Sequence, residues 1–287
     1  MTQGNPSYAP SPTRIAREAA ARRAALRSAF IAATSTVVVG LVLFLAVTHT
    51  PGWDRVQTSF FSWHYATTSL PDVLHGLWLN LRVMVVCEIF ILVIGLLIAV
   101  ARTTRSPLLF PLRILAAAYT DVFRGLPLLL VIFLLGLGVP ALRIEGLTNS
   151  VVVWGSVALI LTYSAYVAEV LRAGIESVHP TQRMAARALG LTPSQTTRFV
   201  VLPQAIRRVV PPLLNDLVSL QKDSGLISVL GAIDAIKAAA IVTATSFNFT
   251  PYVTAGVLFV LLTIPMARFT DWISARMNAR QQQGGLV

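Results

Sequence analysis

Residues 30–48 read FIAATSTVVVGLVLFLAVT, and they lie in a stretch between Arg27 and Asp54 that contains no Asp, Glu, Lys or Arg. This run approaches the ~20 apolar residues that an α-helix needs to cross about 30 Å of hydrocarbon. A cleaved signal peptide would have a shorter apolar core followed by a cleavage site of the A-x-A type. No such cleavage site occurs after Leu45. We therefore predict an uncleaved transmembrane helix over 28–53, preceded by a basic cytoplasmic tail over 1–27.

The composition also indicates a membrane protein. Of the 287 residues, 55% are hydrophobic and 12% are charged, which excludes disorder and is unusual for a soluble domain. A single cysteine, Cys87, excludes an internal disulfide framework. The net charge of +11 is spread in short clusters between apolar runs, unlike the single basic face of a nucleic-acid-binding protein. We therefore expect membrane lipid, and no nucleic acid, among the partners.

Five further apolar stretches follow the first one along the chain. They lie at about 80–101, 114–140, 147–170, 209–231 and 250–270. Within lipid, each backbone polar group of such a stretch must be satisfied internally, as it is in a helix. The predicted fold class is therefore all-α, a polytopic membrane protein with six transmembrane helices.

The distribution of Lys and Arg orients these helices. Alternate connecting segments hold 17 basic residues, and the opposite segments hold 3. Segments rich in Lys and Arg stay in the cytoplasm. We therefore expect a multi-pass protein of the cytoplasmic (plasma) membrane with both termini in the cytoplasm, including a tail over 276–287.

The longest cytoplasmic stretch, Arg172–Arg208, carries signals for two short helices. Pro180 begins a run of good helix formers that stops before Gly190, the preferred residue for a left-handed helix cap. The sequence TPSQ at 192–195 is a capping box that begins a second helix. The pattern predicts a helix-turn-helix with a glycine elbow, and its spacing fits both a knob that inserts into a partner and a simple connector.

Residues 184–203, MAARALGLTPSQTTRFVVLP, closely resemble the EAA loop of permease subunits in ATP-binding-cassette importers. The positions that match in register are Ala185, Ala186, Gly190, Leu202 and Pro203. Two positions depart from the pattern, since Met184 replaces the usual Glu and Val200 replaces Ile. The first change removes a charge from the contact with the ATPase that the resemblance implies.

Three other segments resemble the polar amino-acid uptake branch of this family. They are YTDVFRGLPLLL (119–130), SAYVAEVLRAGIESV (164–178) and LPQAIRRVVPPLLNDLVSLQKDSGLISVLG (202–231). The resemblance covers roughly residues 75–275. It implies a five-helix type I importer core with an EAA coupling loop at about 174–203, to which this chain adds one N-terminal helix.

The resemblance further implies a function and a set of partners. The chain would be the permease subunit of an importer of polar amino acids, together with a cytoplasmic ATPase dimer, an extracytoplasmic amino-acid-binding protein and a second permease, identical or homologous. ATP and Mg would bind to the ATPase, because the chain has no G-x-x-x-x-G-K-[ST] motif. We expect no cofactor, metal site or catalytic residue in the chain itself.

Three other classes of function remain alternatives. An ion- or proton-coupled secondary amino-acid carrier would use Glu88, Lys222 or Asp223 and would need no ATPase. A membrane receptor or scaffold would transport nothing. An intramembrane enzyme is the weakest alternative, because the motifs supply no nucleophile with its base.

Polar residues inside the expected helices are candidates for a translocation pathway, because each buried charge costs on the order of 2.5–3.5 kcal/mol on insertion scales. At ~100° per residue, five polar residues of the fifth helix fall within about one third of its circumference. With Arg124 of the third helix, the candidates are Asn215, Asp216, Ser219, Lys222 and Asp223. Structural salt bridges are the alternative for Lys222 and Asp223.

Four other charges are interpreted as structural. The i,i+3 spacing predicts ion pairs between Asp121 and Arg124 and between Glu169 and Arg172. For Arg124, a contact with the pathway or with the binding protein remains open. Glu88 has no local partner, so we expect it to meet a basic residue of another helix or to stay protonated.

Overall fold

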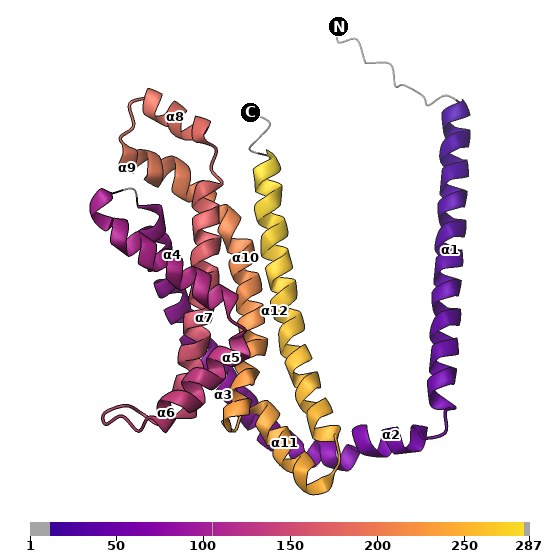
Figure 1. The fold of residues 1–287 in the computed structure, drawn as a ribbon. Coiled ribbons are helices and arrows are strands. Elements are labelled where there is room, and N and C mark those ends of the chain that lie inside the picture. The colour runs from indigo at the N-terminus through magenta and orange to yellow at the C-terminus, as the bar shows by residue number, and fades with distance from the viewer. Residues whose placement is uncertain (1–11, 105, 284–287) are drawn as a thin grey trace. The chain divides into compact units, whose positions relative to one another are not determined.

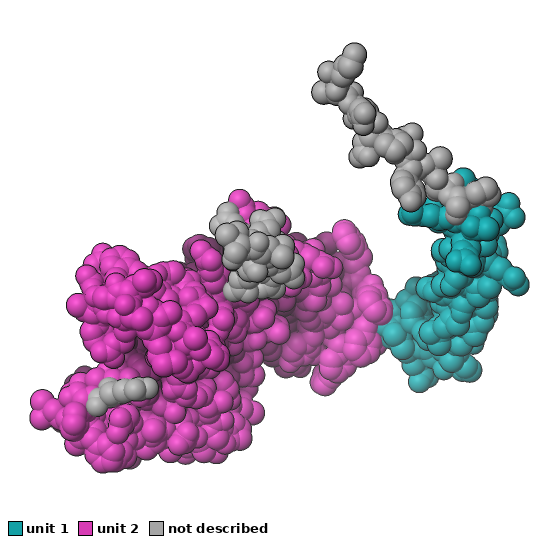
Figure 2. All heavy atoms as spheres, turned by 90° about the horizontal axis from the view of Figure 1, so that it is seen from above, with its two compact units in different colours: residues 1–58 teal, residues 59–287 magenta. Residues whose placement is uncertain are grey.

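The structure is a computed structural model that describes residues 12–104 and 106–283. The described residues form helices and connecting turns with no strand, in agreement with the predicted all-α class. The chain divides into two compact units, residues 1–58 and 59–287, which are shown in Figure 2. The ends of both expected tails, and Arg105 from the basic-residue count, lie outside the described residues.

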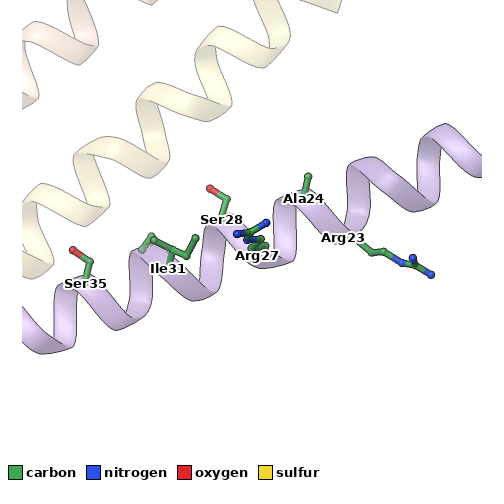
Figure 3. Close-up of a pocket in the computed structure, with 7 residues that line it drawn as sticks. Arg23, Ala24, Arg27, Ser28, Ile31 and Ser35 are labelled. Atoms are coloured by element: carbon green, nitrogen blue, oxygen red, sulfur yellow. The ribbon is translucent and has the colours of Figure 1, made fainter.

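Unit 1 consists of α1 (Pro12–Thr48) and most of α2 (Trp53–Phe60). The 37 residues of α1 extend for about 55 Å at 1.5 Å per residue, more than the ~30 Å of a hydrocarbon core. Figure 3 shows Arg23 and Arg27 on the same helix as Ile31 and Ser35. The described part of the basic tail, residues 12–27, and the first transmembrane helix therefore form one continuous helix, which ends at Thr48.

Unit 2 contains the other membrane-spanning elements (Figure 1). Three single helices are long and apolar enough to cross a bilayer: α3 (Trp63–Thr103), α7 (Val151–Glu176) and α12 (Thr250–Gln283). Two further candidates are bent pairs, Pro107–Gly125 with Leu128–Ala141 and Pro193–Leu230 with Ala235–Ser246. Counted with α1, and with each pair as one span, the described residues hold up to six spans.

The span expected over 114–140 is a bent pair of helices, because the chain bends by 103° between α4 (Phe110–Gly125) and α5 (Leu128–Phe133). Leu126 is extended at φ −88° and ψ 137°. Proline disfavours the helical conformation of the residue before it and has no N–H of its own. Pro127 therefore accounts for the break, after which α5 continues through a π-helical turn (Leu134–Gly138) into α6 (Val139–Ala141).

The fifth expected span, over 209–231, is longer than predicted. It includes α10 (Leu202–Asp223) and a 3-10 helix (Ser224–Leu230), which ends at Gly231 in the left-handed conformation, φ +92°. After a bend of 47° the chain forms α11 (Ala235–Ser246). The sequence patterns did not predict α11.

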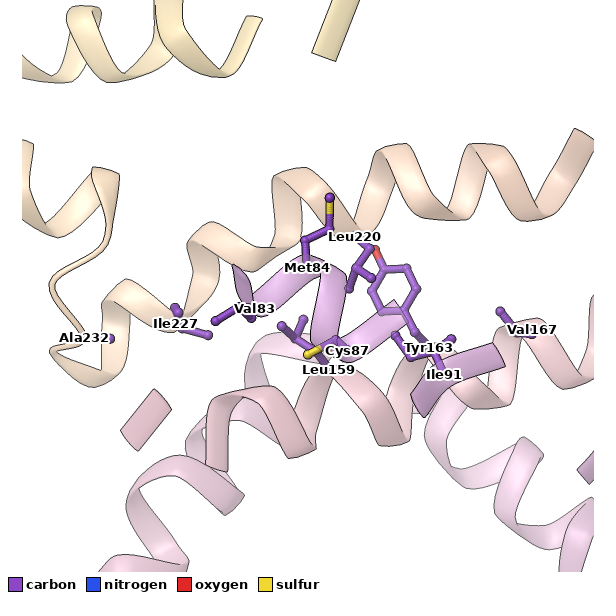
Figure 4. Close-up of a cluster of buried hydrophobic side chains, with 10 residues drawn as sticks. All are labelled: Val83, Met84, Cys87, Ile91, Leu159, Tyr163, Val167, Leu220, Ile227 and Ala232. Atoms are coloured by element: carbon purple, nitrogen blue, oxygen red, sulfur yellow. The ribbon is translucent and has the colours of Figure 1, made fainter. Parts of the chain in front are cut away.

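A cluster of buried apolar side chains joins α3, α7 and α10 (Figure 4). Its members are Val83, Met84, Cys87, Ile91, Leu159, Tyr163, Val167, Leu220, Ile227 and Ala232. Gly95 permits the close approach of α3 to α7, since a Cβ atom there would lie 2.6 Å from Cγ1 of Val167. This packing brings the polar faces of α7 and α10 together.

A buried polar contact ties α11 to α3. Nδ2 of Asn80 donates to Oδ2 of Asp234 at 3.0 Å, and the N–H of Ala235 donates to Oδ1 of Asn80 at 3.2 Å. Asp234 also caps α11 by accepting from the N–H of Lys237 at 2.8 Å. Gly76 lies beside this contact, where a Cβ atom would be 2.3 Å from the backbone carbon of Asp234.

We expect Gly76→Ala to destabilise unit 2 by about 1–3 kcal/mol, because backbone atoms must move to admit the methyl group. Gly256→Ala in α12 is the matched control, since its Cβ would meet nothing within 4 Å, and alanine favours a helix over glycine by about 1 kcal/mol. The fully buried Cys87 supplies the measurement, as a maleimide dye labels it only on unfolding. Equal labelling temperatures for Gly76→Ala and the wild type would contradict the close approach.

Candidate functional site

The EAA loop forms the predicted bent pair of helices, α8 (Pro180–Ala188) and α9 (Pro193–Thr196). Gly190 between them is left-handed, with φ +86°. Both hydrogen bonds of the predicted capping box are present: the N–H of Gln195 donates to Oγ1 of Thr192, and the N–H of Thr192 donates to Oε1 of Gln195. Backbone geometry thus fixes the elbow.

Two arginines tie the EAA loop to the end of α7. Nη2 of Arg183 donates to the carbonyl oxygen of Ile175 at 2.6 Å, and Nη1 of Arg208 donates to that of Ser177. The loop lies at the same end of unit 2 as the C-terminal end of α12 (Figure 1). These bonds anchor the loop to a membrane-spanning helix.

The second helix does not end near Val201. From α9 it passes through a π-helical turn (Thr197–Val201) directly into α10, and Pro203 lies in the first turn of α10. The EAA loop is therefore covalently and helically continuous with the helix that carries the candidate pathway residues.

Most of the residues named for the EAA loop face outward. Met184 is 61% exposed, and Ala185, Gly190, Leu202 and Pro203 are also exposed. Ala186, at 3% exposure, is buried inside the hairpin. The loop thus presents an accessible surface around Met184, and Ala186 serves the internal packing.

An acidic pocket of about 210 Å³ lies between α7 and α10. It is lined by Leu128, Thr162, Tyr163, Tyr166, Asp216, Ser219 and Asp223. The hydroxyl of Tyr163 donates to Oδ2 of Asp223 at 2.7 Å. Because two carboxylates and no basic side chain line this pocket, it favours a ligand with a positive charge.

Two buried oxygens in the acidic pocket have no hydrogen-bond partner: Oγ1 of Thr162 and Oδ2 of Asp216. Thr162 is 2% exposed. A buried polar atom left unpaired costs about 1–3 kcal/mol, so a ligand that pairs with these oxygens recovers that free energy.

The five candidate residues of α10 do not all line the same site. Asp216, Ser219 and Asp223 line the acidic pocket, whereas Asn215 and Lys222 are exposed and do not line it.

Arg124 lies at the edge of this region and not in the pocket wall. Its guanidinium carbon is 5.8 Å from the ring centre of Tyr166, which lines the pocket. The expected pair with Asp121 does not form among the described residues; Asp121 is exposed, and the carboxylate nearest to Arg124 is Glu169, at 3.9 Å. The tertiary packing of α4 on α7 thus replaces the local pair.

Glu169 of α7 is the centre of a group of charges, which we call the Glu169 cluster. Its side chain pairs with Arg172, as the i,i+3 spacing predicts, and with Arg102 of α3 at 2.7 Å. Nη1 of Arg102 also donates to Oγ1 of Thr120 in α4 at 3.0 Å. The cluster therefore connects three helices.

The expectation of a basic partner for Glu88 is not met among the described residues. Glu88 forms none of the salt bridges in that part of the chain, and a protonated carboxyl stays a prediction.

Three pocket residues were missed by the sequence analysis: Thr162, Tyr163 and Tyr166. They lie in a charge-free run that indicated only a membrane span. Their i, i+1, i+4 spacing places polar groups on one side of a helix, and this was the available signal.

Known proteins resemble this chain over most of its length. Residues 91–279 match the family described as binding-protein-dependent transport system inner membrane component. A putative glutamine transport system permease protein of Rickettsia conorii is 35% identical over 206 residues, which are 71% of this chain and 92% of that protein. An arginine transport system permease protein of Bacillus subtilis is 32% identical over 68% of this chain and 87% of its own length.

A solved structure is similar in fold to most of this chain. It is a crystal structure of an amino acid ABC transporter with histidines, with a TM-score of 0.69 and 30% sequence identity. The similarity covers 75% of this chain and 98% of the other.

Proposed function

The chain belongs to the family of inner membrane components of binding-protein-dependent transport systems, and on this premise we propose roles for the EAA loop and the acidic pocket. It is a multi-pass permease of an ABC amino-acid importer, and the ATPase is a separate subunit. The secondary carrier considered from the sequence does not agree with this membership.

The EAA loop is the site that receives the ATPase. Its outward-facing residues, Met184, Ala185, Leu202 and Pro203, supply the contact, and Gly190 sets the angle of the two helices. Because the loop continues into α10, a displacement of the loop by the ATPase moves the pocket residues Asp216 and Asp223 as well. ATP and Mg bind on the ATPase dimer, which acts on two such loops, one from this permease and one from an identical or homologous partner.

The acidic pocket receives the ammonium group that every amino acid carries. The observation that carries this proposal is the pair of unpartnered oxygens, Oγ1 of Thr162 and Oδ2 of Asp216. An ammonium group has three donors and no acceptor, so it satisfies both oxygens. Glutamine and arginine are the first substrates to test, since the similar permeases are described as glutamine and arginine transporters.

Both termini lie in the cytoplasm in this proposal, with the binding protein on the opposite side. The EAA loop and the C-terminal end of α12 occur at one end of unit 2, which supports a shared cytoplasmic location. Asn215 and Lys222, exposed in the single chain, face the second permease across the pathway.

We expect Asp216→Asn to lower uptake by the reconstituted complex about tenfold or more, since a hydrogen bond to a charged group contributes about 1.5–3 kcal/mol. The measurement is the uptake rate of radiolabelled glutamine and arginine at saturating binding protein. Asp271→Asn in α12, whose side chain is 71% exposed, is the control and keeps the wild-type rate.

Two results would contradict these assignments. An unchanged uptake rate in Asp216→Asn removes the pocket from the pathway. Accumulation of substrate by the permease alone, in vesicles without ATP, removes the ATPase from the mechanism.

A further inference from the structure

We propose that the EAA loop binds a carboxylate side chain of the ATPase subunit in a cavity between α8 and α9, so that the charge of this contact is positive on the permease. This inference rests on the proposed role of the EAA loop as the ATPase site. It concerns the consequence of Met184, which stands where the resemblance places a Glu.

The cavity is a distinct feature of the loop, with a volume of about 580 Å³. Its lining includes Arg183, Met184 and Arg187 from α8 and Thr196, Thr197 and Val201 from the following turn. A side chain of a partner protein can enter a space of this size, and the arginines determine which kind.

Arg183 gives the first indication of an anionic occupant. Its Nη2 donates to the carbonyl oxygen of Ile175, which holds the guanidinium in place. Arg183 lines the cavity, so its fixed positive charge in the wall favours a carboxylate occupant.

Arg187 gives the second indication. It lines the same cavity, is exposed and forms no ion pair among the described residues. Glu176, the acidic residue in the cavity wall, already pairs with Arg172. The cavity therefore keeps a net positive charge.

The surrounding sequence carries no compensating charge. Between Ser177 and Asn215 there is no Asp or Glu, whereas Arg183, Arg187, Arg198, Arg207 and Arg208 all occur there. The EAA loop also exposes apolar side chains, with Met184 at 61%, Leu189 at 84% and Phe199 at 60% exposure. The matching partner surface is an apolar groove with a carboxylate placed to reach Arg187 and Arg183.

The sign of the effect of Met184→Glu tests the inference. A new carboxylate at the cavity edge repels an acidic partner side chain and competes with it for Arg187. We expect the ATPase retained by the purified transporter complex to fall at least threefold. An increase in retained ATPase would overturn the proposal, because it would show that the groove is basic. Unchanged ATPase retention in Met184→Glu would overturn the proposal as well. Met184→Leu is the control, because it removes the methionine without adding a charge.

Charge reversal at Arg187 is the second test. We expect Arg187→Glu to lower ATPase retention about tenfold and Arg187→Lys to keep most of it. The dependence of retention on salt is expected to be shallower in Arg187→Gln than in the wild type, because an ion pair across the interface is lost. Arg268→Glu on α12, where the arginine is 82% exposed, is the matched reversal and leaves retention unchanged. Equal retention in Arg187→Glu and Arg268→Glu would overturn the proposal.

These outcomes differ from a failure of the proposed function. If the wild-type permease retained no ATPase, the role of the EAA loop itself would be wrong. If the wild type retained it and only the charge variants behaved otherwise than expected, the loop would keep its role and the carboxylate assignment alone would fail.

Discussion

Replacing Glu169 by glutamine is expected to lower the free energy of unfolding of unit 2 by about 2 kcal/mol. Removal of one partner from a fully buried ion pair costs ~3–5 kcal/mol, and exposed pairs contribute about 0–1 kcal/mol. The Glu169 cluster lies between these limits, since the Glu169 and Arg102 side chains are 23% and 16% exposed. The substitution also leaves Arg102, Arg124 and Arg172 close together without the carboxylate that holds them.

The reason for a large effect is the position of Glu169 among the helices. Arg102 comes from the end of α3, Arg124 from the end of α4, and Arg172 from α7 itself. These helices meet at the same carboxylate, so its loss removes the ion pair that joins the end of α3 to α7. We therefore expect a change in helix packing as well as a local loss.

The measurement is the temperature at which a maleimide dye begins to label the buried Cys87 in the purified full-length permease. Glu176→Gln is the matched control, since Glu176 pairs with Arg172 alone and its side chain is 57% exposed. Its unfolding temperature is expected to stay close to that of the wild type. If Glu169→Gln and Glu176→Gln gave the same small shift, the cluster would be a set of surface pairs with no role in the packing of α3, α4 and α7.

The Glu169 cluster also marks the limit of sequence-based prediction for this chain. The i,i+3 rule identified Glu169 with Arg172, because both lie on one helix. The same rule paired Asp121 with Arg124 and failed, because α7 brings a carboxylate to Arg124 from another helix. Arg102 is 67 positions from Glu169, and no local pattern connects them.

The membrane spans were also predicted only in part. Apolar runs were sufficient to predict the membrane-crossing helices, since hydrocarbon requires length and apolarity alone. Pro127 explains where the chain bends, and the angle of 103° depends on how α5 packs against α7. The 12 residues of α11 are shorter than a span and were therefore not distinguished from a loop.

The acidic pocket was predicted in part. The helical wheel placed Asp216, Ser219 and Asp223 on one side of α10, and all three line the pocket. Asn215 and Lys222 lie only about 100–120° from Asp216 on the same wheel, and they face outward. Which residues of α10 line the pocket depends on the neighbouring helix α7, whose Tyr163 and Tyr166 complete it.

Replacing Gly190 by valine is expected to reduce ATP-driven uptake at least tenfold. The φ of +86° at Gly190 is a left-handed conformation that costs other residues about 1–2 kcal/mol, and a β-branched side chain finds it least accessible. Valine therefore opens the elbow between α8 and α9, and the outward-facing residues of the EAA loop no longer lie in one arrangement.

The surroundings of Gly190 make this test specific to backbone conformation. A Cβ atom at this position would meet nothing within 4 Å, so side-chain volume alone causes no clash. Asparagine tolerates the left-handed conformation better than other residues with a side chain. We expect uptake to follow the order glycine, asparagine, alanine, valine, which is the order of increasing conformational cost and differs from the order of size.

Uptake and ATPase retention, measured on the same reconstituted complexes, show whether the EAA loop transmits motion from the ATPase or only connects α7 to α10. If the EAA loop transmits the motion of the ATPase to α10, Gly190→Val loses uptake, and retention falls with it, while Gly190→Asn stays near the wild type. If the loop only joins α7 to α10, all three variants transport at the wild-type rate, because the hydrogen bonds of Arg183 and Arg208 to α7 still hold the ends of the loop. A loss that followed side-chain size instead would point to a partner surface packed directly against Gly190.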